Sequence, residues 1–123
     1  RRGRPLDGLW RVGVKDIDAR RTWTFVQCLI HSGEVLKIFL DRDLQPALYF
    51  EAKRRGYSKA RLLKTFSYPR AKRSRQGVIQ HRNGHDNHIH VLIRCAKHET
   101  RCKNFSVASS RTKRSRSRRK TKR

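Results

Sequence analysis

Several residue types are absent or scarce in this sequence. Its 123 residues include no Met, only three Cys, and 9 Asp and Glu against 33 Lys and Arg, so the formal net charge is +24. Three cysteines are too few for a disulfide-built miniprotein, and their spacing matches no Cys-x-x-Cys zinc module. No apolar run approaches the roughly 20 residues that a membrane-spanning helix needs, and no signal-peptide pattern is present. We therefore predict a protein without a membrane span and, because residue 1 is Arg, expect a processed product or a fragment.

The composition supports at most one small folded domain. Apolar residues make up 35% of the chain, which limits the core that it can bury. Nine of the thirteen residues from Arg111 to Arg123 are Lys or Arg, yet residues 1–110 still carry a net charge of +15. We expect a domain over 1–102 and a basic, Ser/Arg/Lys-rich disordered tail over 103–123.

Hydrophobic periodicity predicts an α+β domain with a small, mostly antiparallel sheet and two or three helices. Helices are expected behind capping Asp or Ser residues, over 18–32, 44–56 and 58–66. Short, partly β-branched apolar runs predict strands over 35–40, around 78–79, over 89–93, and within 9–14. The helix residues expected in the core are Trp23, Val26, Leu29, Ile30, Leu44, Leu48, Tyr49, Ala52, Leu62, Leu63 and Phe66.

The segment GHDNHIHVLIR, residues 84–94, concentrates three histidines at the start of a predicted strand. A period of two places His88 and His90 on one face, about 6 to 7 Å apart along the strand, and a turn at Gly84 brings His85 toward them. Imidazoles at this spacing can share a zinc ion, or one can bind the metal while its neighbour acts on the bound water. Solvated surface histidines are the alternative, and the spacing leaves both interpretations open. The same period places Leu92 with His88 and His90, and Ile89, Val91 and Ile93 on the other face.

Cys95 and Cys102 enclose a short polar segment. If that segment folds back as a loop, the two thiols can meet. Spacing alone allows either a disulfide or two free thiols, and a disulfide would indicate an oxidising compartment.

The motif from Gly84 to Val91 resembles the C-terminal motif of the penicillin-insensitive murein endopeptidases. These are zinc peptidases of the lysostaphin and D-alanyl-D-alanine peptidase group, and they cut peptide cross-links in peptidoglycan. The resemblance covers roughly residues 15–102. It includes Arg21-Thr22-Trp23, the strand Ile38-Phe39-Leu40, the helix 44–56, Tyr68-Pro69-Arg70 and the last two cysteines.

This resemblance implies a zinc cofactor with His90 as a ligand, and it implies His88 and His85 as catalytic histidines. It also implies a Cys95–Cys102 disulfide, peptidoglycan as the partner, and a periplasmic or secreted location. Members of the family bind zinc with a further His and an Asp from an upstream motif. No His precedes His31, and seven residues later stands the apolar Ile38, so the resemblance implies the C-terminal part of the domain with an incomplete metal site.

Two other interpretations compete with this one. A charge of +24 makes nucleic acid the default partner of a small basic protein, and the basic tail could bind polyanions without specificity. The sequence shows no helix-turn-helix, aromatic RNA-binding signature or C₂H₂ zinc-finger spacing, which disfavours the common nucleic-acid-binding folds. The other is an inactive, truncated paralogue that keeps the fold without the chemistry.

Overall fold

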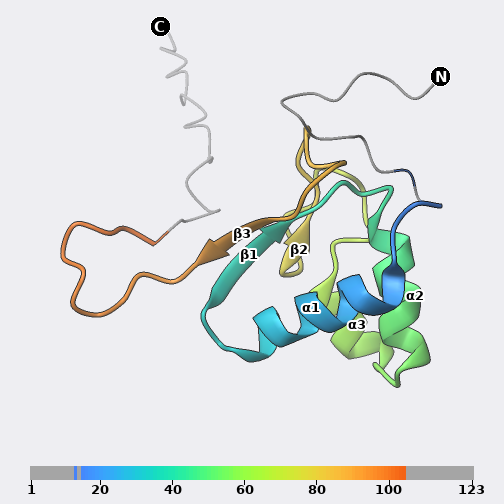
Figure 1. Ribbon diagram of the computed structural model, residues 1–123, viewed down its shortest axis with the longest axis horizontal. Helices are drawn as coiled ribbons and strands as arrows, with labels where there is room; N and C mark the ends of the chain where they lie inside the picture. Colours follow the sequence, from blue (N-terminus) through green and yellow to red (C-terminus); the bar gives the residue numbers. More distant parts are fainter. Residues whose placement is uncertain (1–12, 14, 105–123) are drawn as a thin grey trace, which may run out of the picture.

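A computed structural model describes residues 13 and 15–104 of the 123-residue chain. Its three strands form one sheet in the order β2-β1-β3, and the three helices lie together on one side of that sheet (Figure 1). The predicted α+β class is confirmed. The elements in chain order are α1 (Ala19–His31), β1 (Val35–Phe39), α2 (Gln45–Arg54), α3 (Lys59–Thr65), β2 (Ile79–Gln80) and β3 (His90–Ile93).

The sheet is mixed, so the prediction of a mostly antiparallel sheet is wrong. Strand β1 pairs with β3 in antiparallel orientation and with β2 in parallel orientation, with Ile38 opposite Ile79. A parallel neighbour requires a long crossover, and here α2 and α3 together form it between β1 and β2. The short β2 therefore lies beside β1 in the same direction.

The helix starts follow the predicted capping pattern in two of three cases. The side chains of Asp18 and Ser58 accept hydrogen bonds from backbone N–H groups three residues ahead, at 3.1 and 3.2 Å. Helix α2 instead has Leu44 at its N-cap, with no side-chain cap and with a proline in its first turn. The predicted Asp cap of this helix is wrong, because Asp41 accepts from the backbone N–H of Asp43 at 2.8 Å within the preceding turn.

The core lies between the helices and the sheet. Trp23 is fully buried and packs against the rings of Tyr57 and Phe66, with ring centroids 5.3 and 5.4 Å away. The other members of this core are Val26, Ile38, Leu40, Leu44, Leu48, Ala52, Leu62 and Ile79. Four residues predicted on buried helix faces, Leu29, Ile30, Tyr49 and Leu63, are only partly buried.

On β3 the predicted apolar face is divided. Ile89 and Val91 pack against the core, whereas Ile93 is 68% exposed. Ile93 lies at the end of β3, opposite Val35, where the register with β1 shifts. The predicted burial of this face therefore holds for Ile89 and Val91 and fails at the strand end.

A fully buried amide connects β1 to the chain that follows α3. Gln45 Nε2 donates to the carbonyl oxygen of Leu40 at 3.3 Å. Its Oε1 accepts from the Ser67 hydroxyl at 3.1 Å and from the backbone N–H of Tyr68 at 3.0 Å. These bonds hold the Tyr68-Pro69-Arg70 segment, which contains a cis Tyr68-Pro69 peptide, close to the end of β1.

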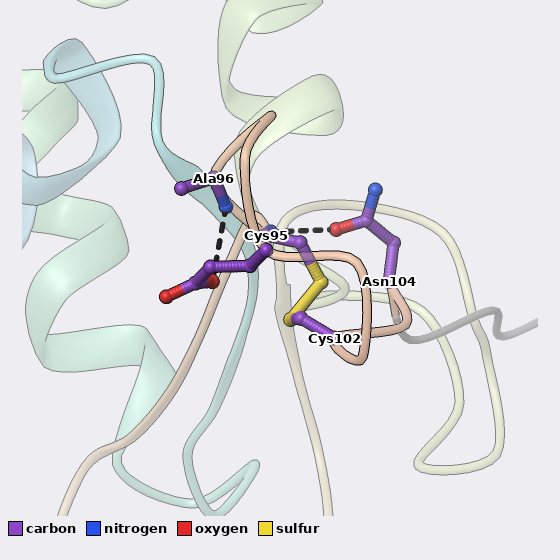
Figure 2. Close-up of a disulfide and its surroundings, with 5 residues drawn as sticks. Cys95, Ala96, Cys102 and Asn104 are labelled. Carbon is purple, nitrogen blue, oxygen red and sulfur yellow. Dashed lines mark hydrogen bonds between the residues drawn. A yellow bond between two sulfur atoms is a disulfide. The ribbon is translucent and has the colours of Figure 1, made fainter.

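After β3 a disulfide joins Cys95 to Cys102 and closes a short loop that extends away from the helices (Figures 1 and 2). The backbone N–H of Cys95 donates to Asn104 Oδ1 at 2.7 Å, which adds a second link across the base of the loop (Figure 2). The disulfide implied by the resemblance is thus present.

Some predictions concern other parts of the chain. The strand within 9–14 lies outside the described residues apart from Gly13, and the tail lies outside them from residue 105 onward. Within the described part of the chain, no helix is long and apolar enough to cross a membrane.

Candidate histidine site

Pairing between β1 and β3 positions the histidine segment at the end of the sheet. Phe39, the last residue of β1, lies opposite His90, the first residue of β3. The chain before β3 turns at Gly84, whose φ of +80° suits glycine. The backbone N–H of Asp41 then donates to the carbonyl oxygen of His85 at 2.8 Å and ties this segment to the exit of β1.

The structure brings His85, His88 and His90 together. His85 Nε2 lies 3.2 Å from His90 Nδ1. The ring centroid of His85 is 4.7 Å from that of His88 and 5.3 Å from that of His90. The cluster therefore converges on the ring of His85.

His85 is the buried member of the cluster, with 9% of its surface exposed, and it makes most of the contacts between the cluster and the rest of the domain. Its Nδ1 faces two backbone carbonyl oxygens, those of Arg82 at 3.2 Å and Asn83 at 3.0 Å. Phe39 packs beside the cluster, with ring centroids 5.9 Å from His85 and 5.7 Å from His90. The contact with the Phe39 ring and the two carbonyl acceptors together hold the His85 ring in place.

His88 and His90 are more open to solvent, and both are exposed. His88 precedes β3, so the predicted placement of His88 and His90 on one strand holds only for His90. His88 Nδ1 lies 2.6 Å from the side-chain oxygen of its neighbour Asn87. Its approach to His85 results from the turn between Gly84 and β3.

The described residues contain no group of three or more His, Cys, Asp or Glu side chains arranged to hold a metal ion. Catalytic zinc sites generally use three protein ligands. The resemblance implies only His90 as a ligand in this chain, with His85 and His88 beside the metal. The part of the chain that the structure describes therefore does not fit a complete zinc site.

His81 was not expected to belong to any site, yet it lies next to the cluster. Its side chain is 8% exposed, its Nδ1 accepts from the backbone N–H of Arg42 at 2.9 Å, and its Nε2 lies 3.0 Å from Asn83 Oδ1. Arg42 in turn donates from its guanidinium to the carbonyl oxygens of Pro69 and Arg70. A lone histidine in a basic loop carries no signal of this kind, because the backbone N–H that it accepts from belongs to a residue 39 positions away.

Comparison of the chain with protein-family models, curated proteins and solved structures found no match.

Proposed function

We propose that this chain is the histidine-bearing C-terminal part of a zinc endopeptidase domain that cleaves peptide cross-links in peptidoglycan. The observation that carries the proposal is the convergence of His85, His88 and His90 at one end of the sheet. His85 Nε2 and His90 Nδ1 are 3.2 Å apart, although five sequence positions separate the residues. The disulfide directly after β3 is a second feature that the resemblance implies.

Zinc bound there would lower the pKa of a bound water and polarise the scissile carbonyl. His90 would contribute one ligand, and His88 and His85 would carry protons and stabilise developing negative charge. Because the described residues provide too few donors, the remaining ligands, a His and an Asp, would come from an upstream part of the domain. The 123-residue chain alone should therefore bind zinc weakly and cleave little.

A zinc titration of the full 123-residue protein, followed through its histidine ring signals in NMR spectra, tests the proposal. Zinc should shift the ring signals of His85, His88 and His90 together with weak affinity, and His90→Ala should abolish the shift. His98→Ala is the matched control, because His98 is an exposed histidine on the disulfide loop, and it should leave the titration unchanged.

Two results would contradict this proposal. Ring signals that do not move even in a large excess of zinc would remove the metal site. Efficient zinc-dependent cleavage of cross-linked muropeptides by the chain alone would show that the missing ligands are already present in it.

Binding to a polyanion is a second candidate function, and the charge of the described domain favours it. Residues 13 and 15–104 contain 20 Lys and Arg against 8 Asp and Glu, a net charge of +12. Deleting residues 111–123 separates the two sources of charge. Nucleic-acid affinity that disappears on this deletion would come from the tail. Affinity that residues 1–110 retain, with a steep salt dependence, would indicate that the domain itself binds nucleic acid.

A further inference from the structure

We propose that His81 and Asn83 are positioning residues: the hydrogen bond between their side chains holds the turn whose backbone carbonyls set the ring tautomers of His85 and His90. The catalytic meaning of this arrangement rests on the proposed function, whereas the tautomers themselves do not depend on it.

The first of these hydrogen bonds joins His81 to the backbone just after β1. The backbone N–H of Arg42 can only donate, so His81 Nδ1, at 2.9 Å, must carry a lone pair. A neutral His81 ring therefore holds its proton on Nε2. That proton points to Asn83, whose side-chain Oδ1 accepts it at 3.0 Å.

The second step runs through the backbone of the turn. The bond from His81 fixes Asn83, and the carbonyl oxygens of Arg82 and Asn83 both face His85 Nδ1. Carbonyl oxygens only accept, so His85 Nδ1 must carry the proton. In the neutral ring, His85 Nε2 is then an acceptor.

The third step reaches the exposed end of the cluster. His85 Nε2 lies 3.2 Å from His90 Nδ1, and a bond between two neutral rings requires a proton on one of these atoms. Since His85 Nε2 is the acceptor, His90 Nδ1 donates. His90 Nε2 is left with a lone pair, so the neutral His90 ring presents a basic nitrogen in the absence of metal.

His81 and His85 have opposite tautomers because opposite kinds of backbone group face their Nδ1 atoms. His81 is Nε2-protonated because a backbone N–H faces it, and His85 is Nδ1-protonated because backbone carbonyls face it. Arg42, whose N–H donates to His81, directly follows Asp41 in the chain. The N–H of Asp41 donates to the carbonyl oxygen of His85 at 2.8 Å. The exit of β1 therefore anchors both ends of the turn that carries residues 81–85.

Long-range ¹H–¹⁵N correlation spectra of the ¹⁵N-labelled, metal-free full chain test the proposal at a pH above the range in which imidazoles titrate. They should show pyrrole-type Nδ1 in His85 and His90, and pyrrole-type Nε2 in His81. His81→Phe should convert the single His85 tautomer to a mixture, and it should speed hydrogen exchange of the Arg42 amide about five- to tenfold because the acceptor is lost.

Further variants separate positioning from loss of the fold. Asn83→Ala alters only an exposed side chain and should also mix the His85 tautomers, whereas Asn83→Asp keeps the acceptor oxygen and should restore the single tautomer. His98→Phe is the control and should change none of these signals.

Two results would overturn the proposal. The first is a pyrrole-type Nε2 in wild-type His85. The second is a single Nδ1-protonated His85 that persists in Asn83→Ala. Both measurements omit zinc, so failure of the zinc titration above would leave this result unaffected and the two failures can be told apart.

Discussion

Replacing Gln45 by Leu should destabilise the domain more than any single hydrogen bond would suggest. The change keeps nearly the same side-chain volume and removes both the donor and the acceptor of a fully buried amide. Three groups, the N–H of Tyr68, the carbonyl of Leu40 and the hydroxyl of Ser67, then lose the bonds that they make to this side chain. Each group left unsatisfied costs about 1–3 kcal/mol, so the expected loss is about 3–9 kcal/mol.

A loss of that size is a large part of the stability of a small domain, which is typically about 5–15 kcal/mol. Urea unfolding of the full chain, followed by circular dichroism, measures it as a shift of the midpoint at constant slope. Ser67→Ala is the matched control, because Gln45 Oε1 keeps the Tyr68 N–H as a partner, and it should cost only about 1 kcal/mol.

A cost below about 1 kcal/mol for Gln45→Leu would refute this reasoning. It would mean that the Tyr68 and Leu40 groups find other partners, and that this amide does not hold the Tyr68-Pro69-Arg70 segment against β1. A cost equal to that of the Ser67 control would lead to the same conclusion.

Three further perturbations have expected outcomes. Hydrogen bonding from Arg54, with a further contribution from Arg55, lowers the pKa of Glu51 to about 2. The stabilisation that ionised Glu51 gives the fold should be complete above a carboxyl's ordinary pKa of about 4.3 and be lost as pH falls through about 2. Acid unfolding should therefore be less steep in Glu51→Gln. Reduction of the disulfide, whose cysteines are seven positions apart, should lower the unfolding free energy by about 2.5 kcal/mol, and an unchanged urea midpoint under reductant would contradict this. Gly77→Ala would place a Cβ 2.6 Å from the backbone carbonyl carbon of Phe66, at a φ of +89°. At Gly56, with a similar φ of +100°, an added Cβ would meet no atom within 4 Å. The thermal midpoint of Gly77→Ala should therefore fall well below that of Gly56→Ala.

The local elements of this domain could be predicted from the sequence because neighbouring residues determine them. The Asp18 cap and the apolar residues at Trp23 and Val26 were enough to predict α1, and Ser58 was enough to predict the start of α3. Each of these signals acts within one or two helical turns. The histidine motif belongs to the same category, since its three members lie within six residues.

Relations between distant residues appeared only in the tertiary structure. The parallel placement of β2 depends on how α2 and α3 pack, and no pattern within the two-residue strand indicates the direction of its pairing. Ile93 has the apolar character of a buried strand residue but is 68% exposed at the end of β3.

The same division applies to the candidate site. Residue spacing shows which histidines lie close along the chain, whereas the fold sets which ring is buried and which atoms face it. His81 acquires its role from the Arg42 amide, 39 positions earlier, and His85 from carbonyl groups whose direction the turn sets. Hydrogen-bond direction depends on backbone orientation in space, so residue identity and spacing alone could not assign these tautomers.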